Sequence, residues 1–455
     1  MVISSFVLLF VSVVLCFASL RSKRGDAIGL PLIAIGTFVY LYGIQALVTL
    51  ESGGGGIFLT RKQFAWAILV PAFMLPCFVW GWNRERPRFR VRRRNLWNAV
   101  RLWNYGFVTA IVGLCLYVVF LHRSGGILHA FSQVHGQAMA WQGNTAYLYD
   151  GPWWVLSGVA MMMYASSGFK LALWRKAGFT ILIAALLADA LLTGSRGVLF
   201  STCGTVFVGS SIASRRTPRL KWAIAVLAVL GFAVLMMLGY RNVLNLGQGR
   251  QQTPTLGQAL NFTTSISPSD IAHGTTGLEF IYHGAVLTTV DQTHKYNFGL
   301  NWIYFLVINP IPRLFWPGKH YPESPGITID DIRETTGLNI ATGSAPGIVA
   351  DLYMEFGLVE AIFLYWFGKL SRRLFGAAWR LESPLAFCGY VMLYALSLNI
   401  FAQDLGPMFV SFGYSMIPIV LYTLLSRANR RHAIAFARHN DSNRAPRIPE
   451  IQCSL

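Results

Sequence analysis

The chain has 455 residues, of which 54% are hydrophobic and only 13% are charged, and its formal net charge is +19. Apolar runs of about 20 residues, the length that an α-helix needs to cross a bilayer, recur along the chain. Such continuous runs exclude a membrane β-barrel, whose strands alternate, and a string of soluble domains. We therefore predict an all-α polytopic membrane protein.

The first apolar run, residues 1–20, has the length of a secretory signal peptide. It lacks a basic amino-terminal region and a small-residue cleavage site, and the basic residues Arg21, Lys23 and Arg24 follow it directly. We therefore expect this run to be a retained helix.

We place about 11 transmembrane helices (10 to 12) in one membrane domain, residues 1–426, which is followed by a basic tail at residues 427–455. We expect this tail to be mobile. Two segments between helices, residues 122–152 and 241–345, are longer than a simple connector. The predicted spans are 2–20, 27–49, 63–82, 104–121, 153–173, 177–193, 197–213, 221–240, 345–368, 384–402 and 405–425.

The positive charge is sorted to one side of these spans. With the amino terminus outside, the segments assigned to the cytoplasm hold 28 of the 38 Lys and Arg residues but only 5 of the 19 carboxylates. The positive-inside rule requires this asymmetry, which puts both long loops outside and the carboxyl terminus in the cytoplasm. The eight arginines of residues 84–101 are then explained by anionic lipid headgroups, so we expect no nucleic acid partner.

The cysteines and histidines have no metal-binding spacing. Five of the six cysteines fall in predicted spans, and none of the nine histidines forms an HxxH or HExxH arrangement. The cysteines behave as small hydrophobic residues. We predict no disulfide framework and no metal site.

Residues 309–326 are the most unusual segment, because five prolines there disfavour any regular helix or strand. A rigid coil that carries Arg313, Lys319, His320 and Glu323 is suited to holding polar groups against a ligand. The apolar run before it, residues 300–315, is too short and too broken by proline to span. We predict a half-inserted or interfacial segment there.

A short turn, Thr193-Gly194-Ser195-Arg196-Gly197, joins two apolar runs at the predicted outer face. Arg196 is either a snorkelling or helix-end residue, or an anion clamp whose planar guanidinium grips phosphate. Asp189 is a candidate partner, with a structural role at least as well supported. Further cations are predicted on this side, each of which alone is explained as a solvated loop charge, and they are Arg241, Arg250, Arg313, Lys319 and Arg333. The combination of Arg196 with the proline-fixed pair Arg313 and Lys319 suggests a substrate with one or two phosphates.

Asp351 and Glu355 are four residues apart and so share one face near the start of a predicted span. Carboxylates near a helix amino terminus are also favoured by the macrodipole. The alternative is that they orient a basic group or deprotonate an acceptor hydroxyl, as His320 and Glu323 also could. Asp404 is most simply a helix cap.

Three motifs occur in an order that resembles a family: Thr-Gly-Ser-Arg-Gly at 193–197, Pro-Arg-Leu-Phe-Trp-Pro-Gly-Lys at 312–319 and Asp-Leu-Tyr-Met-Glu-Phe-Gly at 351–357. The chain resembles the Wzy-type O-antigen and exopolysaccharide repeat unit polymerases. The family often has Glu where this chain has Asp351. The resemblance implies a GT-C-like fold in the bacterial inner membrane, with a periplasmic amino terminus and a cytoplasmic carboxyl terminus.

The resemblance also implies an enzyme that joins undecaprenyl-diphosphate-linked oligosaccharide units in surface polysaccharide biosynthesis. It implies no cofactor, and partners that comprise this lipid-linked substrate, membrane lipid and a chain-length regulator protein. On the diphosphate we expect Arg196, Arg313 and Lys319, with Arg241 and Arg250 as further cations. Aromatic rings that could stack on sugar faces, or anchor at the membrane interface, are Trp302, Trp316 and Tyr321.

Three other readings of the sequence remain open. An O-antigen ligase would use the same donor but transfer the polymer to lipid A core. A polysaccharide-lipid transporter or flippase would show intramembrane charges or broken-helix repeats, and here only Asp189 and Glu360 are intramembrane. The last alternative is an assembly subunit without activity.

Overall fold

The computed structural model describes residues 1–20, 28–51, 59–85, 99–123, 146–169, 172–193, 196–216, 276–308, 311, 316, 326–338, 345–403 and 405–444. Within these ranges every regular element is helical, and none is a strand. The π-helical turns are η2 and η5, and η6 is a 3₁₀ turn. In chain order the elements are α1 (Val2–Leu20), α2 (Leu30–Phe38), η2 (Val39–Ile44), α3 (Gln45–Glu51), α5 (Arg61–Arg84), α6 (Ala99–Arg123), α8 (Ala146–Tyr149), α9 (Gly151–Ser166), α10 (Leu173–Thr193), α11 (Arg196–Ser214), α15 (Thr276–Thr293), α16 (Leu300–Ile303), η5 (Tyr304–Ile308), α17 (Ile329–Thr336), α18 (Gly347–Phe356), η6 (Gly357–Val359), α19 (Glu360–Trp379), α20 (Pro384–Ala402) and α21 (Leu405–Arg444).

Seven helical rods among the described residues are long and apolar enough to cross a bilayer, which makes the chain a polytopic helical membrane protein. The predicted total of about eleven spans remains a prediction, and the predicted span 221–240 lies outside the described residues. The seven rods are Val2–Leu20, Leu30–Glu51, Arg61–Arg84, Ala99–Arg123, Gly197–Ser214, Pro384–Ala402 and Leu405–Ser426.

The prediction of one continuous helix over residues 345–368 was wrong. The chain breaks between α18 and α19 at Gly357, whose φ is 58° and ψ is −144°. Only glycine adopts this backbone conformation readily, and a Cβ there would come within 3.0 Å of the Tyr296 ring. The hydrophobicity of the sequence continues through the break, so it gives no sign of it.

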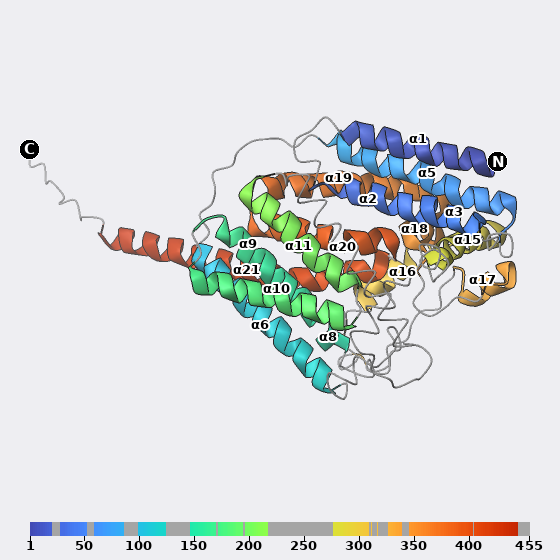
Figure 1. Cartoon of the computed structure of the whole chain (residues 1–455). Coiled ribbons are helices and arrows are strands. Elements are labelled where there is room, and N and C mark those ends of the chain that lie inside the picture. The colour runs from blue at the N-terminus through green and yellow to red at the C-terminus, as the bar shows by residue number, and fades with distance from the viewer. Residues whose placement is uncertain are drawn as a thin grey trace, which may run out of the picture.

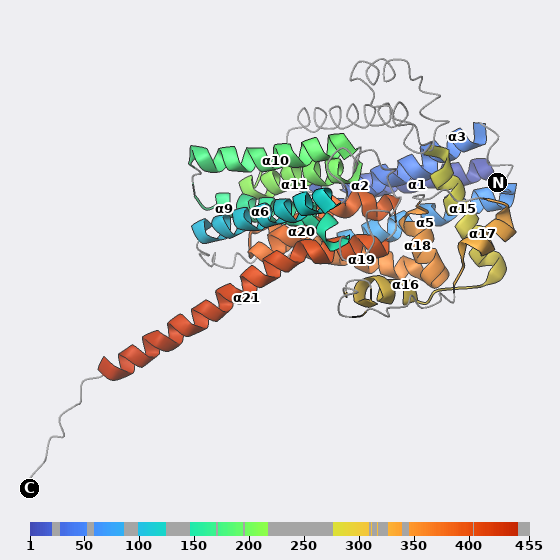
Figure 2. The ribbon, with the colours of Figure 1, turned by 90° about the horizontal axis from the view of Figure 1, so that it is seen from below.

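The first part of the predicted tail is helical, since α21 continues to Arg444, and the expected mobility of the tail stays a prediction. No proline or glycine lies between Ile419 and Arg444, and the helix ends two residues before Pro446. A helix normally ends at or before the residue that precedes a proline. Figures 1 and 2 show this helix projecting from the bundle.

Glycines allow two pairs of helices to pack at very short range. In α6 and α9, a Cβ on Gly113 would lie 2.6 Å from the carbonyl oxygen of Gly151, and one on Gly158 would lie 2.3 Å from that of Gly106. The parallel pair α5 and α19 makes the same kind of contact at Gly81 and Gly368. Small residues at such crossings are how membrane helices gain van der Waals contact without help from the hydrophobic effect.

The bundle has two distinct ends, which we call the loop end and the tail end. The loop end carries the amino terminus of α1, together with α8, α16 and α17, and the tail end is where α21 leaves the bundle (Figures 1 and 2). At the tail end, Arg373 pairs with Glu85 at 3.0 Å and Arg380 with Glu382 at 2.6 Å. Which end faces the cytoplasm stays a prediction.

Part of the predicted outer loop 241–345 is packed into the bundle. The helix α15 contacts α3, α5, α17 and α18, and almost every residue from Phe280 to Val290 is buried. A helix that is buried on all sides is expected to be apolar on all sides. The buried face of α15 nevertheless includes one histidine, His283.

Candidate functional site

The loop end of the bundle brings together the two sides of the candidate site. Residues 297–299, which follow α15, lie against the carboxyl-terminal turn of α18. The backbone N–H of Asn297 donates to the carbonyl of Met354 at 2.9 Å, and that of Phe298 donates to the carbonyl of Glu355 at 3.1 Å. The chain is therefore held in place immediately before α16 and the proline-rich segment.

The carboxylate of Glu355 completes this attachment. One oxygen accepts the backbone N–H of Gly299 at 2.7 Å, and the other accepts the side-chain amide of Asn297 at 3.2 Å. Glu355 is fully buried, and both Phe298 and Gly299 have the positive φ angles that this close turn needs. A buried carboxylate with several donors is stabilised in position, which favours a positioning role over that of a general base.

Asp351 has a comparable attachment to another element. Its Oδ2 accepts the backbone N–H of Leu405, at the start of α21, at a distance of 2.9 Å. A carboxylate that accepts from a helix amino terminus caps the helix and interacts favourably with its dipole. Asp351, which is 6% exposed, thus links α18 to the turn between α20 and α21. The sequence had assigned that capping role to Asp404, which lies outside the described residues.

Arg196 is the first residue of α11 and is described by its backbone only. The next residue, Gly197, packs on the side chain of Asn399, since a Cβ there would be 3.1 Å from the amide nitrogen. The backbone carbonyl of Asn399 accepts the backbone N–H of Gln403 at 2.7 Å, in the last turn of α20. The start of α11 therefore lies beside the same helical hairpin that delivers Leu405 to Asp351.

Asp189 was the sequence candidate for a partner of Arg196. Its Oδ1 accepts a hydrogen bond of 2.7 Å from the hydroxyl of Tyr117 on α6. Asp189 also borders a small apolar cavity between α6, α9 and α10, together with Tyr117 and Leu186. This contact supports the structural role that the sequence left open for Asp189.

The aromatic candidates divide into a packed residue and an accessible one. The ring of Trp302 is edge-on to Phe356 at 5.3 Å and to Phe363 at 5.6 Å, so it is part of an aromatic cluster under α16. Trp316 is 44% exposed and available to a ligand or a lipid. The other predicted site residues lie outside the described residues, and they are Arg241, Arg250, Arg313, Lys319, His320, Tyr321 and Glu323.

The described residues on both sides of the proline-rich segment are anchored near Glu355. Before it, Phe305 of η5 packs on Gly406 of α21, where a Cβ would approach the Phe305 ring to 2.5 Å. After it, the backbone of Gly326 lies directly on the side chain of Asn297. The described residues that precede and follow this segment, Ile308 and Gly326, therefore lie at the same end of the bundle.

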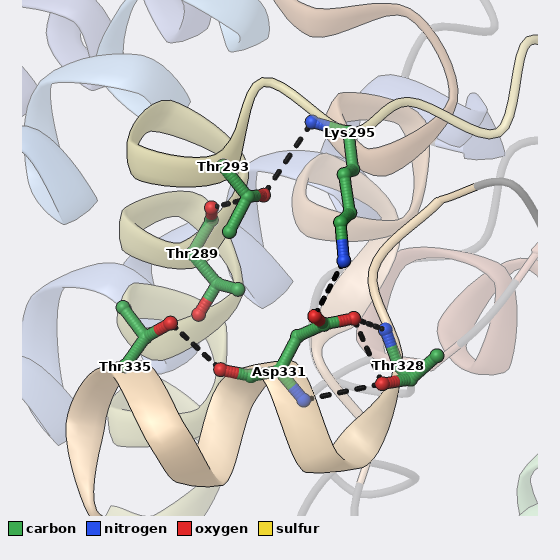
Figure 3. A network of polar contacts seen from close by, with 6 residues as sticks. All are labelled: Thr289, Thr293, Lys295, Thr328, Asp331 and Thr335. Atoms are coloured by element: carbon green, nitrogen blue, oxygen red, sulfur yellow. Dashed lines mark hydrogen bonds and ion pairs between the residues drawn. The ribbon is translucent and has the colours of Figure 1, made fainter.

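A polar network holds residues 326–338, which follow the proline-rich segment, to Lys295 after α15, as Figure 3 shows. Asp331 of α17 binds Lys295 at 2.7 Å and accepts both the backbone N–H and the hydroxyl of Thr328, at 2.7 and 2.8 Å. The hydrogen bond from Lys295, with those from Thr328, lowers the pKa of Asp331 to about 2. The hydroxyl of Thr328 also accepts the N–H of Asp331, which completes a capping box on α17.

Several polar residues that hold this site together escaped sequence reasoning. Asn297 and Gly299 carry no motif, because their role depends on meeting Glu355 across 56 to 58 residues of chain. Gly299, a residue type that tolerates positive φ, was the available signal of a tight turn, whereas the positive φ of Phe298 has no signal in the sequence.

Comparisons of the chain with protein-family models, with curated proteins and with solved structures find no match.

Proposed function

We propose that the protein is a membrane polymerase of lipid-diphosphate-linked oligosaccharide repeat units, acting at the loop end of the bundle. The observation that carries the proposal is the convergence of the Arg196 turn, the Asp351–Leu405 contact and both anchors of the proline-rich segment at that end. These contacts involve two of the motifs on which the sequence resemblance rests, and the described residues that flank the third, 312–319. In this proposal the loop end is periplasmic and the membrane is the bacterial inner membrane.

The chemistry is a glycosyl transfer. The bond between the anomeric carbon of the donor sugar and the lipid diphosphate breaks, and the electron pair leaves with the diphosphate. A hydroxyl oxygen of the acceptor unit forms the new glycosidic bond, and its proton passes to a base. Preorganised cations are needed where negative charge develops on the leaving group, in a site that contains little water.

We assign the diphosphate to Arg196, Arg313 and Lys319, with Arg241 and Arg250 as further cations. Because Asp351 and Glu355 already accept backbone hydrogen bonds, we take them as positioning residues. The base is then His320 or Glu323, on the proline-rich segment. Trp316 and Tyr321 are the aromatic residues proposed to contact the sugars, while Trp302 packs on Phe356.

The test is polymer length in a strain that lacks the gene and carries Arg313→Ala or a control on a plasmid. Arg313→Ala should abolish long-chain polymer and leave single repeat units, with unchanged protein level in the membrane. The matched control is Arg333→Ala, an exposed arginine of α17 that pairs with Asp330, and it should keep the wild-type chain length. Normal chain length in the Arg313→Ala strain would rule out the assignment.

The same strain separates the alternatives. Loss of the gene for a ligase would leave polymer that is not transferred to lipid A core, whereas loss of a polymerase leaves single units. One observation favours a transporter as the second candidate: the helix broken at Gly357, with buried Asp351, Glu355 and Glu360 around the break. Discontinuous helices line substrate or ion sites in many transporters. Accumulation of lipid-linked units on the cytoplasmic face in the deletion strain would favour that candidate.

A further inference from the structure

Two helices depart from regular geometry where they face each other. In the rod of residues 30–51, the π-helical turn η2 contains Tyr42, whose side chain is 1% exposed. The Tyr42 ring lies 4.7 Å from that of His283, and its hydroxyl faces the first turn of α18, where a Cβ on Gly347 would be 2.9 Å away. The neighbouring helical segment of the same chain, α18 and α19, breaks at Gly357. Single π-helical turns frequently occur at functional sites.

Glu360 begins α19 directly after this break. Its side chain is 0% exposed, and neither carboxylate oxygen has a hydrogen-bond partner among the described residues. It takes part in none of the ion pairs that the described residues form. This separates Glu360 from its neighbours Asp351 and Glu355, whose carboxylates accept backbone N–H groups.

Among the residues that the structure describes, the titratable groups that face Glu360 from the packed elements offer it no positive charge. Those within electrostatic reach are Asp351 of α18, Tyr42 of η2 and Cys77 of α5. The nearest imidazole beyond Tyr42, His283, has its Nε2 on the carbonyl of Ala67 at 3.1 Å. An ionised carboxylate without a partner in an apolar interior is so unfavourable that the group takes up a proton or a cation instead.

We propose that Glu360 is a proton-binding site, whose carboxyl is protonated in the packed arrangement seen here. The inference does not rest on the proposed function, because it is argued only from the burial of Glu360 and from the hydrogen-bond and charged groups around it. A multivalent metal is not favoured, because the described residues contain no group of three His, Cys, Asp or Glu that could hold one. A monovalent cation is the alternative that the experiment separates.

Proton binding at this position is coupled to the break between α18 and α19. Any arrangement that opens the break and hydrates the carboxyl favours its ionised form, whereas the packed arrangement favours the protonated form. Because a proton binds the packed arrangement more tightly than the opened one, protonation shifts the population toward the packed arrangement. Gly357 is the residue at which such a movement would take place.

The first experiment compares thermal unfolding of the purified full-length protein with that of Glu360→Gln, a neutral isostere of the protonated acid. At about pH 4, where the unfolded carboxyl is largely protonated as well, the two midpoints should agree. As the pH rises further, the unfolded carboxyl ionises while the packed one keeps its proton, so the wild type should fall progressively below Glu360→Gln, by at least about 2 °C toward about pH 9. The matched control is Glu382→Gln, which removes a carboxylate that is paired with Arg380 and should show no such divergence.

The second experiment uses N,N′-dicyclohexylcarbodiimide, which reacts with protonated carboxyls in apolar surroundings. The carboxyl O–H adds across one C=N bond and the acyl group then migrates to nitrogen, so the whole reagent is retained and nothing leaves. Peptide mass spectrometry should find the label on Glu360 in the wild type and not in Glu360→Gln, with equal yield in sodium and in choline buffers.

Three results would overturn the proposal. A lower midpoint for Glu360→Gln at about pH 6 would mean that the charge of the carboxylate is needed. Protection from the label by sodium, or a midpoint that sodium raises in the wild type alone, would mean a cation site. Coincident pH series for the two proteins, with no label on Glu360, would mean that no proton is held there.

Discussion

The carboxylate of Glu355 accepts the backbone N–H of Gly299 at 2.7 Å, and this contact fastens the chain before the proline-rich segment to the end of α18. The Glu355 carboxylate is fully buried, and Gly299 is partly buried. The contact therefore converts a turn with positive φ at Phe298 and Gly299 into a fixed attachment. Everything proposed for residues 309–325 depends on this attachment, since it determines where that segment begins.

Glu355→Ala should destabilise the protein by about 1 to 3 kcal/mol, because it leaves the Gly299 N–H and the Asn297 amide buried without an acceptor. Glu355→Gln keeps one acceptor oxygen and should lose less. Thermal unfolding of the purified protein measures both. The control is Glu334→Gln on the exposed face of α17, which should stay within about 0.5 kcal/mol of wild type. Equal stability of Glu355→Ala and wild type would contradict the attachment.

Asp351→Asn distinguishes a positioning role from a general base. An asparagine keeps an oxygen that can accept the N–H of Leu405, so we expect near-normal stability and long-chain polymer from this variant. Asp351→Ala should cost about 1 kcal/mol as a lost helix cap. Polymer length and membrane protein level are measured together. Loss of polymer in a stable Asp351→Asn protein would make Asp351 the base.

The segment of residues 326–338 should detach from the bundle in acid. The pKa of Asp331 is lowered to about 2 by Lys295 and Thr328, whereas an unfolded Asp has a pKa of about 3.9. A lowered folded pKa contributes stability above the unfolded pKa, and that contribution is lost as the pH falls from about 4 to about 2. Because Lys295 is half exposed, we expect only about 1 kcal/mol. Hydrogen exchange of α17 should show the change in wild type and not in Asp331→Asn.

Gly158→Ala tests the close crossing of α6 and α9. A Cβ there would lie 2.3 Å from the carbonyl oxygen of Gly106, so the helices must separate and we expect a loss of about 1 to 3 kcal/mol. Gly413→Ala is the matched control, because no atom lies within 4 Å of its added Cβ. That substitution should be neutral, or stabilising by up to about 1 kcal/mol through helix propensity. Thermal midpoints in one detergent measure both, and equal losses would contradict the crossing.

Tyr117→Phe tests the environment of Asp189. The substitution removes the hydroxyl that donates to Asp189 at 2.7 Å and leaves the aromatic ring in place. We expect the free energy of unfolding to fall by about 1 to 2 kcal/mol, because the half-buried carboxylate of Asp189 loses a short hydrogen bond that it accepts. The double variant Tyr117→Phe/Asp189→Asn should recover part of that loss. An additive double variant would show that the two side chains are independent.

The sequence by itself determined the class of the protein. Runs of about 20 apolar residues can satisfy their backbone in lipid only as helices, so composition and length suffice to predict an all-helical membrane protein. The same local rules predicted the ends of most rods to within a few residues, as for α1, α5, α20 and the start of α21. They also predicted that the motifs lie together on the outer face, which stays a prediction.

Only the tertiary structure decided what the buried polar groups do. Asp351 and Glu355 look alike in sequence, yet one caps α21 and the other holds Gly299, because each meets a backbone N–H more than 50 residues away in the chain. The break at Gly357 is likewise invisible in hydrophobicity, since it depends on one backbone conformation beside the Tyr296 ring. Contacts between distant segments gave each carboxylate its partner and left Glu360 without one, and no local pattern contains that information.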